Sequence, residues 1–386
     1  YDAQVKAHQL QLQRLMPSLG LQPFSGNLAL KGSGTDVFSP KTRLDLSAAI
    51  EQFAYNHYKL NNVKANATIK NGRAKVFVDS KNELLYGTIN AEALMSKRLV
   101  DATAVCNLSK ADLHKLRIVN EPLTVGFRGR VGLTTDLKDN YKAFGDVDNI
   151  IVRDSTKDYH PQHVVFNAVT RRDSTYANVS CGDFQLQLNA KGGYKYLLKQ
   201  GNALSTIVQK QIRNKQFDYL QIQNKLPLAH IKLTTGPNNM FMKILKRYGY
   251  KIGSANIDMQ ASPSMGLNGS AEIYDIYAQA NQIDTVRFNM VSQDNQLKYT
   301  AQVRNAPGNP QYVFNALFDG SVLNKDLTLN TKLYDSKNKL ALALGLQGEI
   351  EPKGVRANIK DQNVILGYKE FTVNDSNYVY ISDTQT

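Results

Sequence analysis

The residues whose spacing comes closest to a metal site are His160 and His163, which flank Pro161 in a short run. Because proline breaks a helix, the run is interpreted as an exposed loop before a strand, with a metal-binding pair as the alternative. The chain contains no phosphate-binding loop, nucleophile elbow or His-Glu-x-x-His motif. We therefore expect no enzyme activity, no catalytic residue, no cofactor and no bound metal.

The two cysteines, Cys106 and Cys181, fit no metal or redox spacing. Cys106 ends an alternating apolar run and Cys181 follows another, which indicates two small strand residues. A disulfide in an oxidising compartment is the alternative interpretation. The cysteines alone do not settle where the protein resides.

The formal net charge of +14 raises the question of an anionic partner. Lysine and arginine are spread along the whole chain, and many occupy outward positions of alternating runs, as Lys298 and Arg304 do. This pattern favours a solvated outer face that also discourages pairing between sheet edges. An anionic membrane surface or lipid headgroup is the second interpretation. No aromatic–basic stacking motif occurs, so nucleic acid is not an expected partner.

An alternating apolar–polar phrase, Val63–Ile69, returns at residues 164–169, 286–291 and 327–333. In a strand this alternation places apolar side chains on one face and polar side chains on the other. Each copy is followed by a short polar turn, such as Lys70–Arg73 with its Asn-Gly pair, whose residues accept the positive φ of tight turns. The sequence predicts four hairpins built on one plan.

The expected fold is mainly β: an elongated, repetitive, largely antiparallel sheet with a helical insert. No Pro/Gly/Ser-rich linker divides the 386 residues, so we expect one elongated segment over residues 1–386. Within it we place a first β repeat at 1–95, a second at 96–192, the helical insert at 193–250, and third and fourth repeats at 251–386.

The helical insert ends in a basic amphipathic helix that follows Asn238 or Asn239, either of which is a plausible cap. The simplest interpretation is a helix whose apolar stripe packs on the sheet, and the alternative is contact with a membrane or a lid over a ligand. For that alternative, the candidate membrane or gating residues are Phe241, Lys243, Ile244, Leu245, Lys246 and Arg247.

The number of strands limits how the apolar face is covered. About twenty strands are expected, and a helix ~10 Å wide covers about two strands that lie ~4.8 Å apart. Three helices leave most of the face uncovered, so it must meet itself or an apolar molecule that is not protein. The candidate groove-lining residues are Val63, Ala65, Ala67, Ile69, Val164, Phe166, Ala168, Phe288, Met290, Leu297, Tyr299, Leu327, Leu329, Leu342 and Leu344.

The sequence combines these repeats with Leu-x-x-Leu turns at residues 12–15 and 113–116, the run Leu30–Lys41, and the Leu226-Pro227 and Gly236–Asn239 motifs. In this combination it resembles the AsmA-like group of bridge-type lipid-transfer proteins that includes TamB. The resemblance covers essentially the whole chain. It implies a taco-like groove with an apolar interior that binds phospholipid acyl chains. The long helical insert departs from the plain repeat of that group.

The resemblance also implies a place and a set of partners. The chain is expected to be an internal piece of a longer periplasmic protein, anchored in the inner membrane, that conducts phospholipid toward the outer membrane. A barrel partner of the TamA/BamA type and a role in outer-membrane protein assembly are implied for that parent. No run of eighteen apolar residues occurs, so the segment itself is not expected to span a membrane. A structural or adhesive repeat scaffold that binds proteins at its edges is the alternative.

Overall fold

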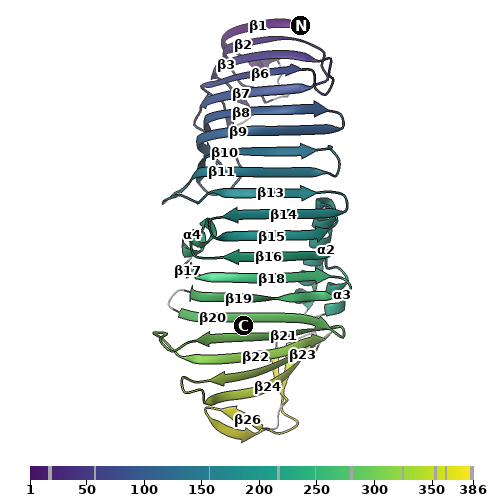
Figure 1. Ribbon diagram of the computed structural model, residues 1–386, viewed down its shortest axis with the longest axis vertical. Coiled ribbons are helices and arrows are strands. Elements are labelled where there is room, and N and C mark those ends of the chain that lie inside the picture. Colours follow the sequence, from purple (N-terminus) through teal and green to yellow (C-terminus); the bar gives the residue numbers. More distant parts are fainter. Residues whose placement is uncertain are drawn as a thin grey trace. The chain divides into compact units, whose positions relative to one another are not determined.

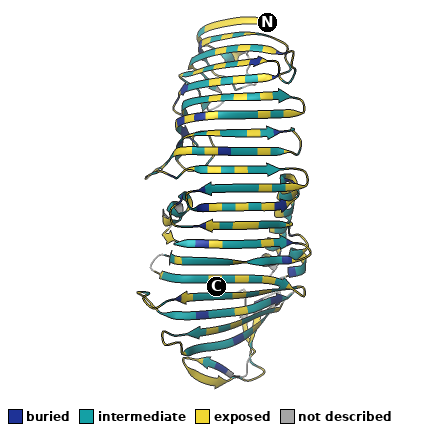
Figure 2. Ribbon diagram, viewed as in Figure 1, coloured by how far each residue is buried: buried dark blue, intermediate teal, exposed yellow. Residues whose placement is uncertain are grey.

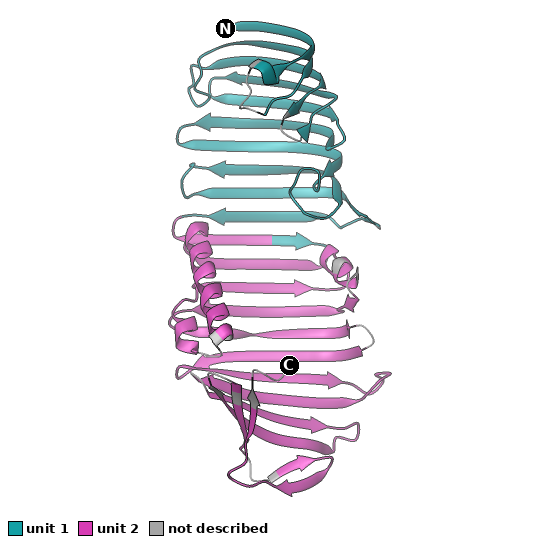
Figure 3. Cartoon of the chain, turned by 180° about the vertical axis from the view of Figure 1, so that it is seen from behind, with its two compact units in different colours: residues 1–171, 179–182 teal, residues 172–178, 183–386 magenta. Residues whose placement is uncertain are grey.

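The computed structural model describes residues 1–15, 20–55, 58–155, 157–214, 218–247, 249–278, 281–323, 326–351, 354–360 and 363–382. Strands account for 64% of the structure and helices for 9%, which confirms a mainly β, antiparallel chain. The chain divides into two compact units, shown in different colours in Figure 3. Unit 1 holds residues 1–171 and 179–182, and unit 2 holds residues 172–178 and 183–386.

Unit 1 is an open antiparallel sheet in which each long strand pairs with its neighbours in chain order (Figure 1). The long strands are β1 (Asp2–Leu10), β2 (Phe24–Ser33), β3 (Arg43–Gln52), β6 (Val63–Lys70), β7 (Arg73–Lys81), β8 (Leu85–Ser96), β9 (Leu99–Asp112), β10 (Leu123–Thr135), β11 (Tyr141–Asp154) and β13 (Val164–Thr170). Short additions are α1 (Leu12–Leu15), the separate pair β4 (Ala54–Tyr55) and β5 (Tyr58–Lys59), and β12 (Asp158–Tyr159), which pairs with β11.

Unit 2 continues the same plan with helices inserted between its first strands. Its long strands are β15 (Phe184–Lys191), β16 (Ala229–Thr235), β18 (Ser254–Ser262), β19 (Gly266–Ala278), β20 (Asn281–Gln293), β21 (Gln296–Asn305), β22 (Phe314–Leu323), β23 (Asp326–Tyr334) and β24 (Leu340–Glu351). The inserted elements are α2 (Tyr194–Asn214), α3 (Tyr219–Gln223), α4 (Met240–Arg247) and β17 (Tyr250–Lys251).

Beyond β24 the sheet of unit 2 forks. β24 pairs with both β25 (Gly354–Ile359) and β26 (Asn363–Leu366), and these pair in turn with β28 (Val379–Ser382) and β27 (Lys369–Thr372). β14 (Ser174–Cys181) is divided between the two units.

The tight turns set the register of the hairpins. Between β6 and β7, Asn71 and Gly72 have φ values of 54° and 71°, and between β20 and β21, Asp294 and Asn295 have φ values of 53° and 61°. Positive φ at both central residues is the conformation that matches the twist of an antiparallel hairpin. The prediction of tight turns at these two positions is confirmed, and each turn closes on a directly opposed pair of residues.

Candidate functional site

Alternating burial separates an apolar face from a polar face along several strands, most clearly β6, β7 and β15 (Figure 2). In β6, Val63, Ala65 and Ala67 are half-buried and Ile69 is buried, whereas the intervening residues are exposed. Because successive side chains of a strand point to opposite faces, the apolar set lies on one side of the sheet. We call that side the apolar face.

The register aligns the apolar residues of unit 1 into rows that cross the strands. Residues directly opposite each other on neighbouring strands lie on the same face. One row is Val5, Leu28, Ala48, Ala65, Val78, Ile89, Cys106, Gly129, Val147 and Val164, and the next is Ala3, Leu30, Leu46, Ala67, Val76, Ala91, Ala104, Val131, Gly145 and Phe166. The remaining candidates of unit 1, Val63, Ile69 and Ala168, lie on this face in flanking rows.

Unit 2 has equivalent rows with larger side chains. One row is Leu186, Leu233, Ile257, Ala271, Phe288, Ala301, Phe318, Thr331 and Leu344, and the next is Leu188, Ile231, Met259, Gly269, Met290, Tyr299, Gly320, Leu329 and Leu346. Leu297 and Leu327 both oppose Val322 on β22, and Leu342 opposes Leu333. The structure thus brings all eight candidates of unit 2 onto one face.

Large apolar side chains within the rows remain accessible to solvent. Ile231, in the middle of β16, is 41% exposed, and Leu133 of β10 is 42% exposed. Most other row members are half-buried, because their neighbours on the same strand and the adjacent strands shield them from the sides only. The apolar face is therefore not sealed by the protein at these positions.

A cavity of about 510 Å³ opens over the strands β19 to β22 of unit 2. Eight of its twelve lining residues, among them Glu272, Arg287 and Asp319, belong to the polar-face rows on either side of the Phe288 row, so the cavity opens on the polar face. On the apolar face of the same strands, Ala301 lies between Phe288 and Phe318 in one row, and its small methyl group leaves a notch between two phenyl rings. Of these residues only Phe288 was predicted from the sequence.

Large side chains on the apolar face lie over glycines of the next strand. Tyr299 lies beside Gly320 and donates a hydrogen bond from its hydroxyl to the Thr328 carbonyl at 2.9 Å. Burial raises the pKa of the Tyr299 phenol, and the negative charge of Asp319 adds to this shift. The ring of Phe166 occupies the space above Gly145 in the same way. Such pairs fill gaps in a sheet that glycine leaves open.

Helix α4 covers the start of β15 at one margin of the unit 2 face. The rings of Phe241 and Phe184 have centroids 4.3 Å apart, and Phe184 is buried. Lys243 and Leu245 are half-buried, and Lys246 is exposed. The simpler expectation, a helix packed on the sheet, holds for Phe241, while the side chains of the candidates Ile244 and Arg247 lie outside the described part of the structure.

The start of α4 is fixed by Asn239, which is fully buried. Its amide nitrogen donates to Asp183 Oδ1 at 2.6 Å and to Thr235 Oγ1 at 2.8 Å, and its amide oxygen accepts from the Met242 backbone at 3.0 Å. The expected cap at Asn238 or Asn239 is confirmed for Asn239. The partner Asp183 was not identified from the sequence, because it precedes a strand far from the helix in the chain.

Helix α3 covers the opposite margin of the unit 2 face. Tyr219 is 2% exposed, and its hydroxyl hydrogen-bonds with Ser292 and accepts from the Leu267 backbone nitrogen at 3.0 Å. Ser292 directly opposes Leu297, so α3 lies at the end of an apolar row. The helical insert thus borders the unit 2 face on two sides and leaves its central rows accessible.

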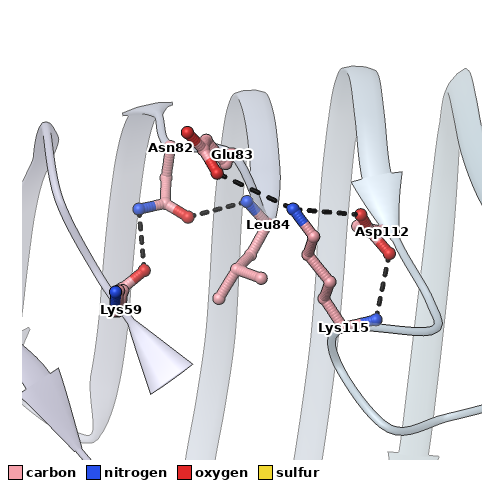
Figure 4. Close-up of polar contacts among 6 residues, drawn as sticks. All are labelled: Lys59, Asn82, Glu83, Leu84, Asp112 and Lys115. Carbon is pink, nitrogen blue, oxygen red and sulfur yellow. Dashed lines mark hydrogen bonds and ion pairs between the residues drawn. The ribbon is translucent and has the colours of Figure 1, made fainter. Parts of the chain in front are cut away.

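Irregular segments take the place of helices at one margin of unit 1 (Figure 4). Buried Asn82 donates to the carbonyls of Lys59 and Asn61, both at 2.9 Å, and accepts from the Leu84 backbone at 2.8 Å. Nearby, Lys115 Nζ lies 3.9 Å from Oδ2 of Asp112, which is buried. These residues were not predicted from the sequence, since nothing in the local pattern marks a buried asparagine.

The residues first considered for chemistry do not come together into a reactive site. His163 Nε2 lies 2.5 Å from Asp146 Oδ1, and the described residues contain no group of three or more side chains able to hold a metal ion. Cys106 and Cys181 are buried free thiols, and burial raises the pKa of Cys106. No helix within the described residues is both long and apolar enough to cross a membrane.

Comparison with known proteins gives no relative: no family model, no curated protein and no solved structure matches this chain. A functional assignment therefore depends on the apolar face itself.

Proposed function

We propose that the apolar face binds the acyl chains of phospholipids and that the protein conducts lipid along it without chemical conversion. The observation that carries the proposal is the alignment of apolar residues into rows that cross the strands while Ile231 and Leu133 stay more than 40% exposed. A face of this extent in water is unfavourable, since each buried CH₂ of a bound chain contributes ~0.8 kcal/mol. Bound acyl chains shield the apolar side chains of this face from water.

Movement along the face requires many similar weak contacts rather than one strong site. Consecutive members of a row offer a bound chain equivalent contacts every ~4.8 Å, the spacing of the strands. A lipid advances by exchanging one set of contacts for the next, while its headgroup stays in water. The proposal needs no catalytic residue.

The finer part of the proposal rests on the resemblance to AsmA-like proteins. In that part, the sheet curls into a taco-like groove, the parent protein spans the periplasm from an inner-membrane anchor, and phospholipid passes toward the outer membrane. A barrel protein of the TamA/BamA type is the proposed partner at the outer membrane.

Paired variants on opposite faces of the same strand test the proposal. Phe166→Asp and Phe288→Asp place a charge on the apolar face, whereas Asn167→Asp and Asn289→Asp place the same charge on exposed neighbours. Native mass spectrometry and lipid extraction of the purified chain should find phospholipid in the wild type and in the asparagine variants. The phenylalanine variants should lose most of it.

Circular dichroism and thermal unfolding establish whether each variant is folded. Folded Phe288→Asp protein that carries as much lipid as Asn289→Asp would rule out the acyl-chain site. A wild-type chain that carries no lipid and takes none up from vesicles would instead favour the non-catalytic scaffold.

A further inference from the structure

Most of the net positive charge of the chain lies in one segment, because that segment contains very few carboxylates. Residues 184–253 contain twelve lysines and arginines but one acidic residue, Asp218, which gives the segment a formal charge of +11 out of +14 for the chain. The Asp218 carboxylate is engaged at the start of α3, where it accepts from the Gln221 backbone at 3.0 Å. The segment contains all of α2, α3 and α4.

The outward side of α2 combines this charge with exposed apolar side chains. Leu197 and Leu204 are half-buried toward the protein, whereas Lys199 is exposed on the other side of the helix. Next to it, Leu198 is 61% exposed, and Tyr196, two residues before Leu198, is 45% exposed. A leucine this exposed on a helix that already buries an apolar stripe has no role in packing the unit.

Neighbouring strand ends extend the same surface. Leu228, just before β16, is 51% exposed, and its carbonyl accepts from the Lys191 backbone at 2.8 Å. Met265, in the turn between β18 and β19, is 61% exposed, and this turn lies beside Leu228 because Ala229 opposes Ala261. We call the surface formed by Lys191, Tyr196, Leu198, Lys199, Leu228 and Met265 the α2 margin.

The lysines of the α2 margin are available to an external anion. Among the residues that the structure describes, neither Lys191 nor Lys199 forms an ion pair. Within unit 2, carboxylates at the same ends of the strands are Asp173, Asp294 and Asp326. At the α4 margin, in contrast, Phe241 is packed on Phe184 and a carboxylate binds the start of the helix.

We propose that the α2 margin docks on the surface of an anionic lipid bilayer. Apolar side chains that project between lysines are the arrangement by which interfacial helices insert at the headgroup boundary, and anionic headgroups attract the lysines. Docking there places the margin of the unit 2 apolar face at the lipid surface. The proposal concerns vesicle binding and does not depend on lipid uptake by the apolar face.

A single fluorophore tests insertion directly, because the chain contains no tryptophan. Leu198→Trp is added to vesicles of phosphatidylcholine alone or with one third phosphatidylglycerol. Its emission should shift to the blue and be quenched by brominated acyl chains with the anionic vesicles only, and less so at high salt. Tyr312→Trp is the matched control, since Tyr312 is 75% exposed in the loop between β21 and β22. Its emission should stay unchanged.

Charge reversal provides the second measurement. Lys191→Glu with Lys199→Glu should lower partition onto anionic vesicles by about tenfold or more. Lys298→Glu with Lys332→Glu, exposed on the polar face, changes the net charge equally and should lower it much less. Equal losses in the two double variants, or an unquenched Leu198→Trp variant, would overturn the proposal. Phe288→Asp should still bind these vesicles, so failure of the acyl-chain site and failure of docking are distinguishable.

Discussion

The apolar faces of the two units share one alternation of residues but differ in the size of their side chains. In unit 1 the central rows contain Ala91 and Ala104 on adjacent strands, whereas the matching region of unit 2 contains Phe288 and Phe318 with Ala301 between them. The small side chains around Ala91 and Ala104 leave a level surface in the middle of unit 1. In unit 2 the phenyl rings of Phe288 and Phe318 flank the small side chain of Ala301, which leaves a notch.

The difference shows how one strand pattern produces two kinds of surface. Alternation decides only which side chains share a face, and their volumes decide whether that face is smooth or notched. For an acyl chain, we expect unit 1 to offer nearly uniform contacts and unit 2 to offer a preferred resting place. The margins differ as well, with helices in unit 2 and irregular segments held by Asn82 in unit 1.

Glycine replacement should produce the largest effect and should separate the units. At Gly320→Ala the new methyl group meets the Thr328 carbonyl oxygen at 1.9 Å, a backbone clash that we expect to cost about 3 kcal/mol. At Gly145→Ala the methyl group meets the Phe166 ring at 2.1 Å, and because a ring can rotate, about 1 kcal/mol is expected. Urea unfolding measures both. Equal losses would show that both units tolerate the added volume alike.

Removal of the buried asparagines compares the two kinds of margin. Asn82→Ala and Asn239→Ala each leave buried backbone or side-chain partners unsatisfied, and we expect each to destabilise its unit by about 2 kcal/mol. Hydrogen exchange should rise around Leu84 in the first variant and along α4 in the second. The exposed Asn66→Ala is the control, with little change expected.

Filling the notch tests the expected resting place. Ala301→Phe should weaken binding of a phospholipid with brominated chains about tenfold, because it displaces about two methylenes of the chain. Ala91→Phe on the level surface of unit 1 should change the affinity about twofold. The control is Gln302→Phe, which adds the same ring on the opposite face. If Ala91→Phe reduces affinity as much as Ala301→Phe, the distinction between the two surfaces is wrong.

The smallest expected effect concerns a turn that both units use. The Asp136 carboxylate accepts from the backbone of Asn140 and Lys138, which lowers its pKa to about 2. The Asp335 carboxylate in unit 2 accepts from the Lys339 backbone in the same way, and its pKa is also lowered. A lowered pKa stabilises the folded state above the ordinary value of 3.8, and this stabilisation is lost as pH falls toward about 2.

Thermal unfolding across this pH range measures the effect in each unit. Asp136→Asn and Asp335→Asn should each flatten the loss of stability at acid pH. A profile unchanged from the wild type would mean that the turns contribute nothing to acid sensitivity.

Local features of the fold followed from the sequence because they depend on neighbouring residues. Asn71 and Gly72 specify their turn by accepting positive φ, and Asn239 caps α4. The face on which each strand residue lies could also be predicted from the sequence, because side chains alternate along a strand with a period of two whatever the partner strand is. All fifteen groove candidates share the apolar faces of their units on this basis.

Features that depend on residues far apart in the chain could not be predicted from the sequence. The alignment of Ala301 between two phenylalanines requires the register of three strands, and the bond between Asn239 and Asp183 joins residues far apart in the chain. The net positive charge of the helical insert was not recognised from the sequence for a different reason. Lysine and arginine are spread evenly, so only a count of the missing carboxylates distinguishes residues 184–253.

Nearly every long strand in each unit pairs with the strand before it and the strand after it. A hairpin is therefore a complete repeating unit of the sheet. Inserting or deleting one changes the length of the apolar rows by ~10 Å, twice the strand spacing, and every remaining side chain stays on the same face. Duplication of a few dozen nucleotides can therefore lengthen such a sheet in whole steps, without the redesign of a core.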